Sequence, residues 1–279
     1  MRARMSALKN NEVDYTLMPR IGIIGGSGVY NPDKFELIDT VFPDTPYGKP
    51  SDEILIGKIN GVEVAFLPRH GKNHQHPPSS VPYKANIYAM KDLGVEMIVS
   101  PCAVGSLKEE FQPGDMVIVD QFVDFTKKRD YTFFDDRTVH ISIAEPICPQ
   151  MSDVFDKAAK EMGIRYHRGG TYVCIEGPRF STRAESYMFR NFADIIGMTL
   201  VPECQLAREM GMCYCSLATI TDYDAWKDEV VDVQMVFDTM AACLAKITEI
   251  LERGLPELDK LPACSCIEAA IGCGAIEKP

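Results

Sequence analysis

The chain has 279 residues, of which 46% are hydrophobic and 25% charged, an ordinary composition for a soluble protein that buries a substantial core. Its formal net charge of −11 at pH 7 argues against the basic surface that nucleic-acid binding needs. No apolar stretch approaches the length of a membrane span, and the first 20 residues lack the apolar core of a secretory signal, so we expect a cytoplasmic protein.

Segments with strand and helix patterns alternate along the chain. The expected strands cover residues 20–26, 53–67 (a hairpin), 95–100, 116–124, 170–177 and 212–221. The expected helices cover residues 83–94, 152–163, 182–193, 203–211 and 231–253. Asn60-Gly61 marks the hairpin turn, Ser152 caps the second helix, and Thr182 and Glu185 have the spacing of a capping box. This alternation predicts an α/β sheet with helices on both faces.

No internal repeat, low-complexity linker or change of composition divides the chain. We therefore expect a single domain over residues 20–254. A leader of residues 1–19 precedes it, and a cysteine-containing tail of residues 255–279 follows it.

Ten cysteines are many for a chain of this length. Four lie within apolar runs and are expected to pack in the core: Cys174, Cys213, Cys215 and Cys243. In the tail, Cys264, Cys266 and Cys273 lie among glycine and alanine. A zinc site would need a second C-x-x-C or paired histidines, which do not follow, so we predict no metal. Intracellular disulfides are the other interpretation, and the spacing does not give their pairing.

Two stretches carry side chains suited to an anion. "GGSG" at residues 25–28 follows the first strand, where glycine backbone N–H groups and the Ser27 hydroxyl can donate to an anion. Its spacing is not that of a dinucleotide-binding turn. "PRHGKNHQHPP" at residues 68–78 offers the fork of Arg69 and a donor on His70. The histidine spacing matches no helical face, so we expect no metal here and solvated rings at His74 and His76.

Other candidates follow the later strands. Phe180 lies in a loop before a capped helix, where it either packs or lies flat against a base, and Met198 and Thr199 lie at another junction. In "ATITDYDAW", residues 218–226, Asp222 and Asp224 end a buried strand. They either stop the strand and face water or meet a ligand.

Seven motifs together resemble one family, the 5′-methylthioadenosine phosphorylases within the trimeric purine nucleoside phosphorylases. They occur in the family's order over residues 21–251: "GIIGGSG", "RHG", "AVGSL", "QPGDMVIVDQF", "IEGPRFSTRAES", "GMTLVPE" and "TDYDAW". The leader and the tail lie outside the resemblance. It implies a single domain with a mixed, partly barrel-like central sheet flanked by helices on both faces.

The resemblance implies phosphorolysis of 5′-methylthioadenosine to adenine and 5-methylthioribose 1-phosphate, in purine and methionine salvage. No cofactor is expected, and inorganic phosphate is a co-substrate. The matching phosphate-site positions are Ser27, Arg69, His70, Cys102, Ala103 and Thr199. Some relatives carry Thr where this chain has Cys102, which favours a backbone contact there.

By the same resemblance, Asp222 protonates or hydrogen-bonds N7 of the leaving purine, which requires a raised pKa in a dry pocket. Asp224 accepts from the 6-amino group or secures Asp222. The matching base and sugar positions are Phe180, Ser181, Met198, Thr221, Val233, Val236, Phe237 and His140. Helical spacing places Val233, Val236 and Phe237 on one face, which a core stripe would also show. His140 would close the pocket of a neighbouring subunit in a homotrimer or a hexamer.

Three alternatives remain open, and a fourth is excluded. A purine nucleoside phosphorylase acting on adenosine, inosine or guanosine is the nearest, although an acid at position 222 favours adenine over 6-oxopurines. A nucleosidase would use water and would not need Arg69 and His70. A non-catalytic nucleotide sensor would bind without turnover. A hydride-transferring Rossmann enzyme has the wrong glycine spacing.

Overall fold

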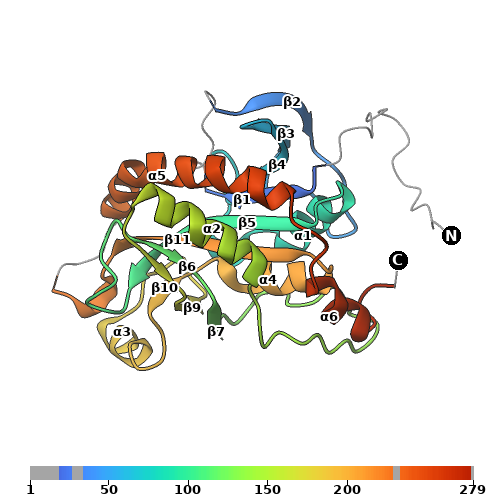
Figure 1. Ribbon diagram of the computed structural model, residues 1–279. Helices are drawn as coiled ribbons and strands as arrows, with labels where there is room; N and C mark the ends of the chain where they lie inside the picture. Colours follow the sequence, from blue (N-terminus) through green and yellow to red (C-terminus); the bar gives the residue numbers. More distant parts are fainter. Residues whose placement is uncertain (1–18, 27–33, 229–232, 278–279) are drawn as a thin grey trace.

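The structure is a computed structural model that describes residues 19–26, 34–228 and 233–277. Its centre is one sheet of eleven strands (Figure 1). The strands are β1 (Ile21–Gly25), β2 (Glu36–Val41), β3 (Ile54–Ile59), β4 (Val62–Pro68), β5 (Met97–Ser106), β6 (Met116–Ile118), β7 (Gln121–Phe125), β8 (Tyr166–Arg168), β9 (Thr171–Ile175), β10 (Ile195–Gly197) and β11 (Cys213–Asp222).

The sheet branches at β5. Along one path the order is β2-β3-β4-β1-β5-β10-β9-β7, while β11 pairs with β5 and β6, and β6 pairs with β8. β1, β4, β5 and β11 run parallel where they pair, whereas the β2-β3-β4 meander and the β10–β5 pair are antiparallel. The predicted mixed sheet in a single α/β domain is therefore confirmed.

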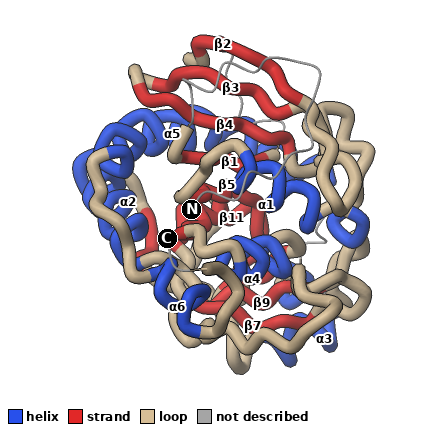
Figure 2. Tube along the Cα trace, turned by 90° about the vertical axis from the view of Figure 1, so that its right-hand side faces the viewer, coloured by secondary structure: helices blue, strands red, loops and turns tan. Residues whose placement is uncertain are grey.

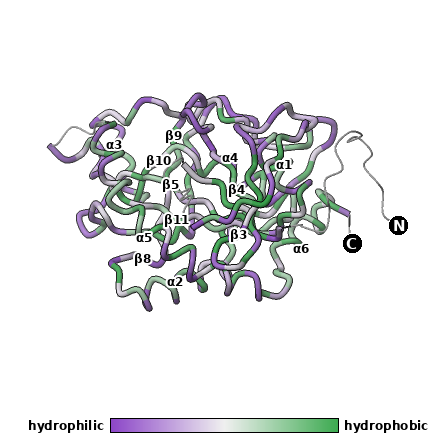
Figure 3. Tube along the Cα trace, turned by 90° about the horizontal axis from the view of Figure 1, so that it is seen from above, coloured by the Kyte–Doolittle hydropathy of each residue, from purple (hydrophilic) through white to green (hydrophobic). Residues whose placement is uncertain are grey.

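Helices cover both faces of the sheet (Figure 2). They are α1 (Tyr83–Asp92), α2 (Pro149–Met162), α3 (Arg183–Phe189), α4 (Leu200–Glu209), α5 (Val233–Asp259) and α6 (Cys266–Gly272), with 3₁₀ turns η1 (Pro78–Ser80) and η2 (Asp224–Trp226). α2 packs on α5, and α1 packs on α4. Apolar residues concentrate on the central strands, and hydrophilic residues follow the outer loops (Figure 3). No helix among the described residues has the length and apolarity to cross a membrane.

The core forms because the central strands are apolar on both sides. β1 and β11 are buried along their whole length, as is expected for parallel strands covered by helices on both faces. The hairpin at Asn60-Gly61 is present, with both residues at positive φ. The capping box of α3 is also present, with Thr182 Oγ1 accepting from the Glu185 N–H and Glu185 accepting from the Thr182 N–H.

The structure adds β8, β10 and α6 to the predicted elements and divides the strand predicted over residues 116–124 into β6 and β7. It differs from the predictions at three further elements. β2 is an exposed edge strand that the sequence did not predict, because its polar residues lack a buried face. α2 begins at Pro149 rather than at Ser152, since proline suits the first helical position, and Cys148 precedes it without a side-chain cap. The domain boundary predicted after residue 254 falls inside α5, because Gly254 does not end the helix but packs against the Phe155 ring.

Candidate active site

A cavity of about 760 Å³ opens at the carboxyl ends of β5 and β11. Strand ends, the loop before α3, the loop after β4 and the first turns of α5 all contribute to its wall. It brings together fourteen of the sixteen predicted site residues: Arg69, His70, Cys102, Ala103, Phe180, Ser181, Met198, Thr199, Thr221, Asp222, Asp224, Val233, Val236 and Phe237. The carboxyl end of parallel strands is where α/β sheets bind ligands.

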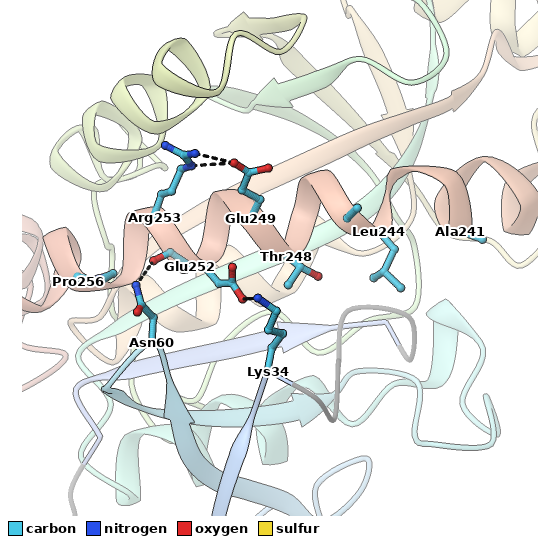
Figure 4. A pocket seen from close by; sticks show the side chains of 10 residues that line it. Lys34, Asn60, Ala241, Leu244, Thr248, Glu249, Glu252, Arg253 and Pro256 are labelled. Carbon is cyan, nitrogen blue, oxygen red and sulfur yellow. Dashed lines mark hydrogen bonds and ion pairs between the residues drawn. The ribbon is translucent and has the colours of Figure 1, made fainter.

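A second hollow lies between α5 and the chain around Lys34 and the Asn60 hairpin turn (Figure 4). Its charged groups are already paired with one another. Lys34 Nζ lies 3.0 Å from Glu252 Oε1, and Arg253 Nη2 lies 2.7 Å from Glu249 Oε1. This hollow contains no described residue that the sequence predicted as a site residue, so the first cavity is the candidate site.

Asp222 and Asp224 both face the cavity and are buried. Asp222 Oδ2 accepts from Thr221 Oγ1 at 2.8 Å, and Oδ1 accepts from the backbone N–H of Asp224 at 2.8 Å. Burial raises the pKa of the Asp222 carboxyl, and the nearby negative charge of Asp224 raises it further. Asp224 adopts a left-handed backbone (φ +52°), and the Ser181 hydroxyl lies 2.6 Å from both of its carboxylate oxygens. The surface-facing interpretation of these two acids is therefore excluded.

Gly105 lets the Asp222 carboxyl lie against β5. β5 and β11 pair in parallel register, but the register shifts between Ile220 and Asp222, so that Asp222 is opposite Gly105. A Cβ on Gly105 would lie 2.9 Å from Asp222 Oδ1 and 3.3 Å from the Asp224 Cβ. A side chain at this position would displace the acid, so the glycine is part of the site.

Arg69 is almost completely buried and pairs with Glu203, a residue to which the sequence gave no role. Its Nε and Nη2 donate to the two Glu203 oxygens at 2.7 and 3.0 Å. Nη2 also donates to the Ile24 carbonyl and to Ser100 Oγ, both at 2.6 Å, and Nη1 to the Pro101 carbonyl at 3.3 Å. The guanidinium group has five N–H donors, and most of them are already bound to these protein oxygens. One N–H of Nη1 remains for a ligand.

His70 is not arranged as the anion donor that the sequence predicted. Its Nδ1 lies 2.8 Å from the His76 carbonyl oxygen, and because a carbonyl only accepts, Nδ1 carries the proton. Burial, and then the charge of Arg69, lower the pKa of His70 to about 4. The ring is therefore neutral near pH 7, and its Nε2 is an acceptor.

His74 and His76 both contribute to the cavity wall; His74 is exposed to solvent, as predicted, and His76 is half-buried. The His74 ring stacks on His70 at 5.9 Å between centroids and meets Phe237 edge-on at 5.9 Å. The sequence gave no signal for this contact, because it joins the loop after β4 to α5, far along the chain.

Cys102 and Thr199 line the same cavity as Arg69. The Cys102 thiol lies 3.6 Å from Ser216 Oγ, and burial raises its pKa, so it is a neutral thiol with a hydrogen-bonding partner on β11. This arrangement favours the expected backbone contact over a side-chain one. Thr199 directly precedes α4, and its backbone N–H donates to Tyr172 Oη at 3.3 Å.

Apolar side chains form the mouth of the cavity. Phe180 is 38% exposed, and Val233 and Phe237 are 56% and 50% exposed. The capping box of α3 fixes the end of the loop that carries Phe180, and the first turns of α5 carry the other two. Exposed apolar groups around a cavity are suited to covering an apolar part of a ligand.

Of the other two predicted residues, one lies outside the described part of the chain and the other lies away from this cavity. Ser27 lies outside the described residues. His140 is exposed in the segment between β7 and α2 and does not line the cavity of its own chain. All ten cysteines are free thiols, so the structure does not support the predicted disulfides. Cys213 is buried as predicted but joins the tail cysteines in a cluster described below.

The chain was compared with known families and structures. The model of the phosphorylase superfamily matches residues 20–255. An S-methyl-5′-thioadenosine phosphorylase of Thermococcus kodakarensis is 60% identical over 252 residues, which cover 90% of this chain and 97% of that protein. The protein of the same name from Pyrococcus furiosus is 57% identical with the same coverage.

Two solved structures are similar in fold. A methylthioadenosine phosphorylase from Schistosoma mansoni in complex with adenine has a TM-score of 0.86 and 38% identity, covering 91% of this chain and 97% of that one. A methylthioadenosine phosphorylase from an Antarctic soil metagenomic library has a TM-score of 0.87 and 44% identity, covering 92% of each chain.

Proposed function

The chain belongs to the S-methyl-5′-thioadenosine phosphorylases of the phosphorylase superfamily, and from this membership we propose that it catalyses phosphorolysis of 5′-methylthioadenosine. A phosphate oxygen attacks C1′ of the sugar as the N9–C1′ bond breaks, and adenine and 5-methylthioribose 1-phosphate leave. One observation carries the proposal. A buried carboxyl with a raised pKa and a set of anion-binding groups lie in the same cavity.

The anion-binding groups are those around Arg69. The remaining N–H of Arg69, the backbone of Cys102 and Ala103, and the hydroxyl of Thr199 donate to phosphate oxygens, together with Ser27. His70 accepts through Nε2 from the hydroxyl of a protonated phosphate, because its Nδ1 proton is already bound to His76. Phosphate held beneath C1′ gains from position and from charge complementarity.

The end of the cavity that holds Asp222 and Asp224, the acid end, binds the purine. Asp222 is held by Thr221 and by the Asp224 N–H, and it donates to N7 as the base leaves. A carboxyl with a raised pKa holds its proton closer to neutral pH, where general acid catalysis is effective. Asp224 is fixed by Ser181 and accepts from the 6-amino group, while Phe180 stacks on the base.

The apolar end binds the 5′-methylthio group. Val233, Val236 and Phe237 cover it, and Met198 packs under the ribose. His140 lies on the surface of its own chain, which is consistent with closing the cavity of a neighbouring subunit in a homotrimer. The reaction needs no cofactor, phosphate is a co-substrate, and it belongs to purine and methionine salvage in the cytoplasm.

Release of adenine from 5′-methylthioadenosine, measured with and without phosphate, tests this proposal. We expect release that depends on phosphate and is faster than release of base from adenosine, inosine or guanosine under the same conditions. Release without phosphate would show a nucleosidase, and faster cleavage of inosine or guanosine would show a 6-oxopurine enzyme. Binding without release of base would show a sensor.

A further inference from the structure

Four cysteines converge below the sheet, away from the active-site cavity. Cys148 directly precedes α2, Cys213 is the first residue of β11, and Cys264 and Cys266 lie at the start of α6. Their sulfur atoms all lie within 4.8 Å of one another. Cys264 Sγ is 3.6 Å from Cys148 Sγ and 3.4 Å from Cys266 Sγ.

These distances fit a metal site and are too long for bonded sulfurs. A tetrahedral zinc ion with Zn–S bonds of about 2.3 Å holds its sulfurs about 3.8 Å apart, whereas bonded sulfurs are about 2.05 Å apart. Three of the four cysteines are buried and the fourth is half-buried, so bulk water is largely excluded. Four thiolates that can surround one ion favour zinc or iron among the common metals.

A buried arginine lies beside this cluster. Arg208 on α4 is only 6% exposed, and neither its Nε nor its Nη1 has a hydrogen-bond partner within the described residues. α4, which carries Arg208, packs on α6, which begins at Cys266. A buried cation without partners is costly unless an anion compensates it.

Arg208 would offset part of the charge of a metal-loaded cluster. Four thiolates and one divalent ion carry a net charge of −2, which the Arg208 guanidinium partly neutralises. Cys204 is also near Arg208, but its thiol donates to the Pro146 carbonyl at 3.4 Å and is therefore turned to another partner. The ligand set is thus limited to the four converging sulfurs.

We propose that Cys148, Cys213, Cys264 and Cys266 bind one Zn²⁺ ion through four thiolates. Binding releases the thiol protons and involves no oxidation or reduction. The ion joins the C-terminal segment to the start of α2 and to the start of β11, where the Cys148 N–H already donates to the Tyr214 carbonyl at 2.9 Å. The site is structural, because no position is left for a substrate.

Metal analysis of the full-length chain, purified with reductant and without chelator, tests the proposal. We expect about one zinc ion per chain from this four-sulfur geometry, and an intense sulfur-to-cobalt charge-transfer band after Co²⁺ replacement. The double variant Cys264→Ser/Cys266→Ser should lose the metal. Cys273→Ser, which changes a tail cysteine outside the cluster, should keep it.

Two outcomes would overturn the proposal. One is wild-type protein with only traces of metal and no tetrathiolate spectrum with Co²⁺. The other is a thiol count without reductant that shows these four cysteines paired in disulfides. Should the double variant not fold, the wild-type protein still decides, because a thiol reagent must release one zinc ion for every four sulfurs it modifies.

Arg208→Met tests the counter-charge. Changes to groups around a metal site typically weaken affinity about 10- to 100-fold, so we expect faster loss of zinc to a chelator. Arg253→Met removes a surface arginine paired with Glu249 and serves as the control. Equal zinc retention in the two variants would refute the role of Arg208.

Discussion

At the scale of single residues, the sequence indicated which side chains belong to the site but not how their hydrogen bonds are used. Arg69 was predicted as a fork for phosphate, whereas the structure shows most of its donors bound to Glu203 and to carbonyl or hydroxyl oxygens. Glu203 lies within the apolar run "LVPECQLA", and a charged residue in such a run is the signal that could have identified it. The pairing itself joins residues 134 positions apart.

Arg69→Ala should therefore lower stability as well as raise the KM for phosphate. Loss of one partner from a buried ion pair costs about 3–5 kcal/mol, because Glu203 is left charged and unpaired. Urea unfolding and kinetics with both substrates measure the two effects. Arg69→Met/Glu203→Gln should recover most of the stability but not the KM, since the amide still accepts from Ser100 and Tyr214. Wild-type stability in Arg69→Ala would show that the pair is not structural.

Asp222→Asn should lower turnover of methylthioadenosine about 100-fold or more, because the proton donor is lost, and should shift preference toward 6-oxopurines. The pKa of Asp222 is raised, so its proton is present below that pKa and is lost as pH rises through it. The wild-type rate should thus fall on the alkaline side through this ionisation, and the variant should lack that limb. Unchanged kinetics would remove Asp222 from its assigned role.

The raised pKa of Asp222 also affects the free energy of unfolding. Because the folded state holds the Asp222 proton more tightly than the unfolded chain does, its contribution is full at pH below the ordinary aspartate pKa and is lost as pH rises through the raised pKa. Denaturation of wild type and Asp222→Asn across that range provides the second readout. We expect the difference between them to change in favour of the variant as pH rises.

At the scale of elements, the pairing of β5 with β11 positions both ends of the site. Cys102 is opposite Ala218, and Gly105 is opposite Asp222, so β5 carries part of the anion-binding end and contacts the acid end three residues later. The sequence predicted both strands, the hairpin and the capping box, because each depends on neighbouring residues. It could not predict the register shift at Asp222, which depends on how two distant strands meet.

Gly105→Ala tests this contact. The added Cβ would lie 2.9 Å from Asp222 Oδ1, and the backbone of β5 cannot move away without breaking the pairing with β11. A displacement of about 1 Å costs on the order of 100-fold in rate, so we expect such a loss of kcat with the fold retained. Gly272→Ala has nothing within 4 Å of its added Cβ and should be neutral. Equal kcat in the two variants would contradict the role of Gly105.

At the scale of the whole molecule, residues far apart in the sequence meet in groups that spacing alone does not indicate. Cys148 and Cys264 are 116 residues apart, so a search for C-x-x-C pairs could not reveal their cluster. The cavity was better predicted, because family motifs mark its separate segments in order. His140 remains the exception, since one chain does not bring it to its own cavity.

Mixed oligomers test the role of His140. His140→Ala and Asp222→Asn should each be impaired as pure oligomers. In a trimer formed from both, some sites combine the Asp222 of one chain with the His140 of its neighbour. Random mixing in a cyclic trimer restores roughly a quarter of the sites, so activity should exceed that of both parents. Activity equal to the mean of the parents would show that His140 acts within its own chain or not at all.

The division of the cavity between the sheet and α5 has a consequence for how selectivity can change. The acid proposed for bond breaking ends β11, and part of the proposed phosphate site lies on β5, at a spacing that strand register sets. The groups proposed to recognise the sugar's far end lie on α5, a helix that enters the cavity only through its first turns. Substitutions in those turns can therefore retune which nucleoside is accepted while leaving the reacting geometry intact, so new substrate preferences can evolve on this scaffold without rebuilding its chemistry.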